Sequence, residues 1–247
     1  PGAGCNLTYC NLSYGGGGSN IYGILHLSGA ANKVTIANCT IHSSGTAGIY
    51  LSNSSPPITS CNISNNTGDG IYLTTTSSPT ITNCTLDANG GRGIYTDLTS
   101  TDCNPTLTNV SVTNSGSYPL RLTAQALVLS SGITVSGNNP DQIEVIGGSI
   151  SSSGTWYNLA PYLILADTTI SSGQTLTIEA GCQVKFNGNY QLQVNGILKA
   201  EGTSTSPITF TSNQTSPTPG YWKRLYFYNP GAGCNLTYCN LSYGGGG

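Results

Sequence analysis

Short alternating runs of apolar and polar residues recur along the first half of the chain. In VTIANCTI, Val34 and Ile36 alternate with polar or small neighbours, and Cys39 and Ile41 do the same one step later. A period of two residues is typical of β-strands that bury one face. Because the step from Ile36 to Cys39 breaks this period, the chain is expected to bend at Asn38. Helical spacing is absent, so no helix is expected over residues 32–122.

The pattern recurs at a nearly constant spacing, in three segments that align with one another: Asn32–Ser55, Ser55–Ser77 and Ser78–Ser100. The alignment contains a cysteine column, an isoleucine column and a tyrosine column. Like residues at one spacing predict side chains that stack from turn to turn. The predicted core ladder consists of Cys39, Cys61, Cys84, Ile49, Ile71, Ile94, Tyr50, Tyr72 and Tyr95.

An asparagine recurs at the predicted bend. Asn38, Asn83 and Asn109 occupy it, with Ser60 as the exception. Asparagine tolerates the left-handed backbone conformation, and its amide can bond along a stack. These three residues are therefore expected to form a turn ladder.

The predicted fold is all-β, a parallel solenoid in which three short strands and three turns make each rung. About ten rungs of 22–23 residues would fill one long unit, with strands about 4.8 Å apart along the axis. The rungs are regular over residues 1–124 and less regular over 125–229, where TLTIEAGCQVKF and QLQVNGILKAEG keep the alternation.

A much longer repeat frames the chain. Residues 1–18 and 230–247 both read PGAGCNLTYCNLSYGGGG. A tandem array, an engineered duplication or overlapping ends of a periodic object would each produce this identity. A tandem array is favoured, with residues 1–229 as one continuous unit and 230–247 as the start of the next. Since the chain contains no methionine and opens without a basic and apolar leader, it is expected to be an internal or processed segment.

The second half resembles a known family. TLTIEAGCQVKF, GILKAEGTSTSPITFTS, PTPGYWKRLYFY and CNLTYCNLSYGG look like the extracellular right-handed parallel β-helix repeat proteins, and TNCTLDANGGRGIY is similar to the same pectin-lyase-like group. The resemblance implies a right-handed helix and an extracellular, secreted or cell-surface location. It says little about activity, because the group includes polysaccharide lyases, sugar-binding proteins and uncharacterised surface proteins.

Composition narrows the choice of function. Charged residues make up 6% of the chain and the net charge is −2, so no electrostatic footprint for nucleic acid is present. No apolar run approaches the roughly 20 residues that span a bilayer. Hydrophobic residues still make up 37%, which is enough to build a core rather than a disordered chain.

The acidic residues do not form a convincing catalytic pattern. A lyase or hydrolase on this fold needs two or three carboxylates converging on one face. In the column before each GIY, Ala47, Asp69 and Arg92 predict one exposed ion pair. His26 and His42 fall in different rungs. We therefore expect no enzyme, no metal and no cofactor.

The cysteines permit two interpretations. Cys39, Cys61 and Cys84 fit a ladder of buried thiols, whereas Cys5, Cys10 and Cys103 are candidates for disulfides in an oxidising compartment. No spacing suits a structural zinc site.

Two surface features remain. Among the Asn-x-Ser/Thr sequons, Asn53, Asn65 and Asn213 fall in predicted outward turns and are candidates for glycosylation. Five aromatic residues cluster near the junction of the units and predict either an internal aromatic stack or a sugar-binding platform: Tyr221, Trp222, Tyr226, Phe227 and Tyr228.

These observations favour a structural extracellular protein whose tandem units form a fibre, stalk or surface filament. The alternatives are a carbohydrate-binding or polysaccharide-cleaving cell-surface protein, or an adhesin. The expected partners are other copies of the unit, by head-to-tail or lateral contact, and cell-surface glycans. Neither nucleic acid nor a membrane is expected as a partner.

Overall fold

The structure, a computed structural model, describes residues 4–17, 22–29, 33–100 and 102–246. Residues 1–3, 18 and 247, which belong to the two copies of the repeat, lie outside the described residues. The chain divides into two compact units. Unit 1 comprises residues 1–122 and 130–141, and unit 2 comprises residues 123–129 and 142–247.

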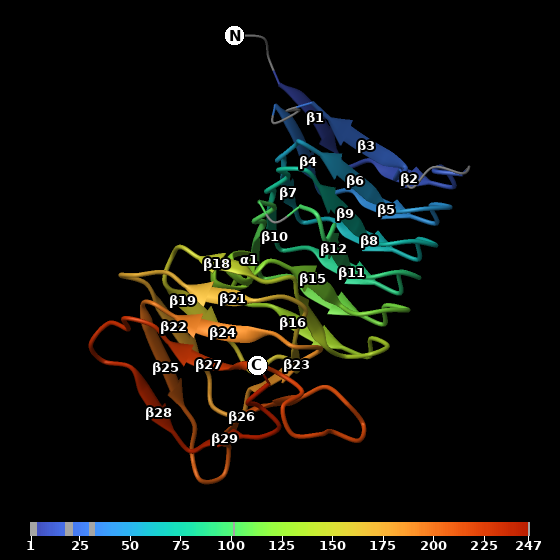
Figure 1. The fold of residues 1–247 in the computed structure, drawn as a ribbon. Coiled ribbons are helices and arrows are strands. Elements are labelled where there is room, and N and C mark those ends of the chain that lie inside the picture. The colour runs from blue at the N-terminus through green and yellow to red at the C-terminus, as the bar shows by residue number, and fades with distance from the viewer. Residues whose placement is uncertain (1–3, 18–21, 30–32, 101, 247) are drawn as a thin grey trace. The chain divides into compact units, whose positions relative to one another are not determined.

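Unit 1 is built from three stacks of parallel strands, and each turn of the chain adds one strand to each stack (Figure 1). The first stack contains β1 (Cys5–Thr8), β4 (Val34–Ala37), β7 (Pro57–Thr59), β10 (Thr80–Thr82) and β13 (Thr106–Thr108). The second contains β2 (Asn11–Ser13), β5 (Thr40–His42), β8 (Asn62–Ser64), β11 (Thr85–Asp87), β14 (Ser111–Thr113) and β16 (Thr134–Ser136). The third contains β3 (Leu25–Ser28), β6 (Ile49–Ser52), β9 (Ile71–Thr74), β12 (Ile94–Thr96) and β15 (Leu120–Leu122).

The strands of unit 2 follow the same plan and also stand in three stacks. They contain β18 (Gly148–Ile150), β21 (Thr168–Ile170), β24 (Gln191–Val194) and β27 (Arg224–Phe227); β19 (Gly154–Trp156), β22 (Thr175–Ile178), β25 (Ile197–Glu201) and β28 (Asn235–Thr237); and β17 (Ile143–Val145), β20 (Tyr162–Ile164), β23 (Gln183–Phe186), β26 (Ile208–Ser212) and β29 (Cys239–Leu241). The strands pair in parallel within each of these stacks.

The core consists of aliphatic columns, because strands in register place like residues over like. Ile49, Ile71 and Ile94 follow one another in adjacent strands, and each is 0% exposed. Ile41 and Ile63 do the same in the neighbouring stack. Each rung buries its inner face mainly against the rungs beside it, so the stability of the solenoid is shared among rungs.

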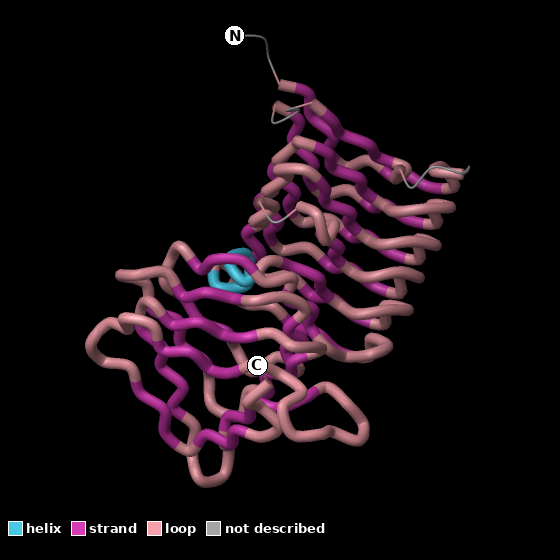
Figure 2. Tube along the Cα trace, in the orientation of Figure 1, coloured by secondary structure: helices cyan, strands magenta, loops and turns pink. Residues whose placement is uncertain are grey.

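The all-β prediction is confirmed, with two corrections. The solenoid makes about eight turns, slightly fewer than the ten rungs expected. Some turns are longer than the regular rung, since the step from Cys10 to Cys39 exceeds the step from Cys39 to Cys61. The second is a short helix, α1 (Ala124–Val128), which interrupts the strands just beyond residues 32–122, the range over which no helix is expected (Figure 2).

Helix α1 forms for local reasons that strand periodicity does not reveal. The hydroxyl oxygen of Thr123 accepts a hydrogen bond from the amide of Ala126 at 3.0 Å, which caps the first turn. Alanine, glutamine and leucine then follow, all of which favour a helix. With five residues, α1 is too short to show a helical period in the sequence. All five are buried, and α1 contacts β18 and β19 within unit 2.

Candidate functional surfaces

The acidic side chains are spread over the turns instead of converging on one site. Among the described residues, no group of three or more histidines, cysteines and carboxylates could hold a metal ion. Asp87 accepts hydrogen bonds from Thr113 at 2.6 Å and from Asn114 at 2.8 Å. Asp141 accepts from the amide of Gly137 at 2.9 Å. Asp87 therefore joins neighbouring turns, whereas Asp141 holds its own turn together.

Further carboxylates have the same role. Glu179 accepts from the amide of Asn158 at 2.7 Å, and Asp167 pairs with Lys223 at 3.0 Å on the surface. The Asp69 carboxylate accepts from the backbone amide of Arg92 at 2.6 Å. The Arg92 guanidinium lies 5.0 Å from the ring centre of Tyr95.

The predicted thiol column lies in the core of unit 1. Cys39, Cys61 and Cys84 are 1–3% exposed, and the Cys61 amide donates to Sγ of Cys84 at 3.4 Å. Each thiol also donates to the backbone carbonyl two residues earlier, at 3.2–3.3 Å. The hydrogen bond to Cys84 and then burial raise the pKa of Cys61. A raised pKa suppresses the thiolate, the reactive form of cysteine.

Cys10 belongs to this column, which the sequence did not reveal. The Cys10 carbonyl accepts from the amide of Thr40 at 2.9 Å, as the Cys39 carbonyl does from Asn62. The signal was hidden because the step from Cys10 to Cys39 is longer than the steps that follow it. Neither Cys5 nor Cys10 forms a disulfide. Cys103 keeps its thiol, which donates to the Thr75 carbonyl at 3.1 Å, and burial raises its pKa to about 11.

The tyrosine column does not share the inner face with the isoleucines, contrary to expectation. Successive residues of a strand point to opposite faces, so Tyr50, Tyr72 and Tyr95 lie outside when Ile49 and Ile71 lie inside. Their rings form a continuous outer column, 5.0 Å apart between Tyr50 and Tyr72 and 4.6 Å apart between Tyr72 and Tyr95. Tyr50 is only 7% exposed, because neighbouring rings cover it on this outer face.

The outer column has cationic and aromatic neighbours at its two ends. The Arg121 guanidinium lies 5.2 Å from the ring centre of Tyr95, on the same ring as Arg92. The ring of His26 stacks on Tyr22 at 4.6 Å and meets Tyr50 edge-on at 4.9 Å. The result is a stripe of aromatic and guanidinium groups along the third strand stack of unit 1.

The turn ladder has the left-handed backbone conformation that asparagine tolerates at a bend. Asn38, Asn83 and Asn109 all have positive φ, between 52° and 54°, and Ser60 has φ 53°. The Asn109 side-chain amide donates to Oδ1 of Asn83 at 3.1 Å.

A second, buried asparagine ladder was missed from the sequence. The side-chain amide of Asn66 donates to Oδ1 of Asn89 at 2.8 Å, and that of Asn89 donates to the Ile63 carbonyl at 3.0 Å. Asn89 is 0% exposed. The signal was the residue following the second bend, which is asparagine in SNN, DAN and SGN. In the next rung Ser115 takes this position, and its backbone amide donates to Asn138 at 3.0 Å; Asn138 in turn donates to the Val112 carbonyl at 3.2 Å.

The candidate glycosylation sites differ in accessibility. Asn53 and Asn65 are exposed and sit at positive φ of 50° and 53°. Asn213 is half-buried, and its side-chain amide donates to Asn187 at 3.3 Å.

The aromatic cluster near the end of unit 2 divides between core and surface. Trp222 is 2% exposed and stacks on Phe186 with ring centres 4.2 Å apart. Its indole N–H donates to the Ser242 carbonyl at 2.8 Å. Tyr226 and Tyr228 contact each other at 5.7 Å outside the core, and Tyr228 is 51% exposed.

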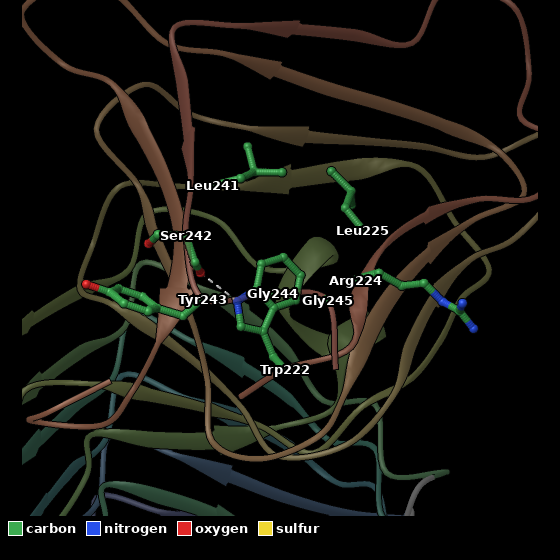
Figure 3. Close-up of a pocket in the computed structure, with 8 residues that line it drawn as sticks. All are labelled: Trp222, Arg224, Leu225, Leu241, Ser242, Tyr243, Gly244 and Gly245. Carbon is green, nitrogen blue, oxygen red and sulfur yellow. Dashed lines mark hydrogen bonds between the residues drawn. The ribbon is translucent and has the colours of Figure 1, made fainter. Parts of the chain in front are cut away.

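A pocket of about 330 Å³ opens beside Trp222 (Figure 3). Its wall is formed by residues of β27 and of the last described rung, and five of the eight belong to the second copy of the repeat. The lining residues are Trp222, Arg224, Leu225, Leu241, Ser242, Tyr243, Gly244 and Gly245.

Comparisons with known proteins agree with this architecture. Residues 1–150 match the model of the right handed beta helix region, and residues 148–246 match that of the pectate-lyase like beta helix domain. Protein bark beetle of Drosophila melanogaster is 39% identical over 57 residues, which is 23% of this chain and 2% of that protein. No solved structure matches.

Within the described residues, no helix has the length and apolarity needed to cross a membrane. The parallel strand stacks, the inward aliphatic columns and the match over residues 1–150 all point to one architecture. The chain belongs to the right-handed beta helix family.

Proposed function

We propose that this chain is one unit of an extracellular structural protein in which tandem β-helix units form a fibre, stalk or surface filament. The observation that carries the proposal is the duplicated segment. The same residues form paired strands at both ends of the described chain, as β1 and β2 and again as β28 and β29. A segment that pairs in either position is suited to repetition along a continuous solenoid.

The chemistry of the surface supports a mechanical function over a catalytic one. Asp87 is engaged with a neighbouring turn and Asp141 with its own turn, whereas hydrolysis of a polysaccharide needs acids that face a substrate together. The low proportion of charged residues and the exposed Asn53 and Asn65 sequons support an extracellular location.

Mass and imaging of the native material test the proposal. We expect denaturing mass measurement to show chains far above the 25.4 kDa of this sequence, and electron microscopy to show filaments. Native particles of about one unit would reject the fibre. Cleavage of polyuronates by the purified material, abolished by a carboxylate substitution, would reject the non-catalytic assignment.

A second candidate function is carbohydrate binding, as a surface lectin or adhesin. The outer column of Tyr50, Tyr72 and Tyr95, with two guanidinium groups on Tyr95, favours it, because aromatic faces and arginines suit sugar rings and acidic sugars. Glycan-array binding that Tyr72→Ala removes, and that Tyr228→Ala in unit 2 leaves intact, would support this function. The absence of binding to neutral and acidic glycans would exclude it.

A further inference from the structure

We propose that the repeated segment, residues 5–16 and its copy 234–245, is the joint of the array. The joint is one rung that is shared by two successive 229-residue units of the array; these are the tandem units, not the compact units 1 and 2. Its docking partner is the next copy of the 229-residue unit, through the counterparts of residues 24–29 and 33–42. This inference rests on the proposed tandem array and specifies how successive units meet.

Both copies of the segment have the same backbone conformation. Tyr9 and its counterpart Tyr238 bend the chain with φ of 56° and 48°, and Tyr14 and Tyr243 do so with φ of 60° and 63°. The Cys10 thiol donates to the Thr8 carbonyl at 3.5 Å, and the corresponding bond in the second copy measures 3.6 Å. The segment therefore needs no rearrangement to serve in either position.

The two copies pair with different neighbours but keep the same side chains inward. In the first copy Leu7 pairs with Ile36 of the following rung. In the second copy its counterpart Leu236 pairs with Ala200 of the preceding rung. Ile36 and Ala200 are both 0% exposed, so this leucine points into the core in each case.

The neighbouring strand of the joint follows the same rule. Leu12 pairs with Ile41 of the following rung, and its counterpart Leu241 pairs with Phe210 of the preceding rung. Ile41 and Phe210 are fully buried, whereas Leu241 is 50% exposed. A shared rung would place one leucine between the two buried partners and cover its exposed side.

The hydrogen bonds of the two copies are complementary. Toward the following rung, the amide of Tyr9 donates to Ala37 at 3.1 Å, and the carbonyl of Cys10 accepts from Thr40 at 2.9 Å. Toward the preceding rung, the amide of Ser242 donates to Phe210 at 3.0 Å, and the carbonyl of Tyr238 accepts from Ile208 at 3.1 Å. None of these bonds uses a backbone atom that another needs, so one copy can make all of them.

The pocket beside Trp222 is explained by the same joint. In the first copy, a Cβ built on Gly15 would lie 2.7 Å from Cγ1 of Ile24. In the second copy, a Cβ on the counterpart Gly244 would lie 3.0 Å from the Trp222 ring, and Gly244 lines the pocket. In a shared rung, Trp222 and the Ile24 of the next 229-residue unit would therefore both lie on the Cβ side of this glycine, with the Ile24 side chain packed at the pocket beside the Trp222 ring.

The joint also determines which strand follows. Every third strand of the solenoid returns to the same stack. Since β28 and β29 of the shared rung follow β27, the next strand, β3 of the next 229-residue unit, would lie on β27. This would cover Phe227, which is 38% exposed.

Hydrogen exchange of this chain and of a chain of two consecutive units tests the inference. In this chain we expect slow exchange at Tyr9 and Ser242, and fast exchange at Tyr238 and Ser13. In the two-unit chain the Tyr238 amide should exchange at least about 100-fold more slowly, because it would gain a backbone partner in the second unit. Peptides that start before Pro230 distinguish this copy from the others.

A matched variant of the two-unit chain carries Leu236→Asp and Leu241→Asp in the shared rung. It should return the Tyr238 amide to fast exchange while both units keep slow amides in strands such as β9. Fast exchange at Tyr238 in the unsubstituted two-unit chain would overturn the inference. Loss of protection in β9 of the second 229-residue unit of the substituted chain would also overturn it.

The outcomes separate the joint from the fibre. Native filaments with an unprotected Tyr238 in the two-unit chain would overturn the joint and leave the fibre standing. A protected Tyr238 together with single-unit native particles would support the joint and reject the fibre.

Discussion

Removing the buried amide of Asn89 should destabilise unit 1 far more than removing an exposed amide from the same rungs. Asn89→Ala deletes the acceptor of Asn66, whose side-chain amide bonds it at 2.8 Å and whose backbone amide bonds it at 3.3 Å. It also deletes the donor to the Ile63 carbonyl at 3.0 Å. The site is 0% exposed, so water does not replace these partners.

The magnitude follows from the groups left unpaired. A buried polar group that loses its partner costs about 1–3 kcal/mol, and both the Ile63 carbonyl and the Asn66 side chain are affected. The Asn66 amide retains a long contact of 3.5 Å to the Ile41 carbonyl, which reduces its share. We therefore expect a loss of about 3 kcal/mol in the free energy of unfolding.

Urea denaturation followed by circular dichroism measures this loss, with Asn62→Ala as the matched control. Asn62 lies exposed in β8, and its replacement should change the free energy of unfolding by less than about 0.5 kcal/mol. Equal effects of the two substitutions would refute the argument that the buried ladder stabilises the turns.

Three further predictions concern thiols and aromatic rings. Because burial raises the pKa of Cys103 to about 11, its thiolate is scarce at pH 8, and a thiol reagent should label the exposed Cys5 first while the fold is intact; equal labelling rates would contradict this. Tyr72→Ala removes two ring contacts and should cost about 1–3 kcal/mol of stability in urea denaturation, whereas no measurable loss would show that the outer column is not cohesive. Trp222→Ala should cost about 3–5 kcal/mol by the same assay, and a loss below about 1 kcal/mol would contradict the packing described on Phe186.

The parts of the fold that the sequence predicts are those that repeat at constant length. The regular period aligns the isoleucines and the bend residues, since each rung makes the same contacts with the next. The positive φ at Asn38, Asn83 and Asn109 follows from the odd step between alternating pairs and from the backbone preference of asparagine.

The predictions are wrong where a turn is longer than the regular rung or where a side chain points to the outer face. The tyrosines were assigned to the core because they form a column, although the alternation of Ile49 and Tyr50 already places them on opposite faces. Cys10 was separated from its column by a longer first turn. Helix α1 depends on a single cap at Thr123 and is too short to leave a period.

The candidate surfaces were only partly predictable for a related reason. Sequence shows that aromatic residues gather at 221–228, but the partners of each ring depend on pairing with distant strands. Trp222 contacts Phe186 through such pairing, whereas Tyr228 remains outside. The complementary bonding of the two copies of the repeat was likewise visible only once each copy had its neighbours.

The most direct test of the account is diffraction or cryo-electron microscopy of oriented native material. A solenoid that continues through every joint stacks its strands along the filament, so the account predicts a strong repeat of about 4.8 Å parallel to the filament axis. Filaments in which that strand repeat runs across the axis, or isolated particles of one unit, would contradict it.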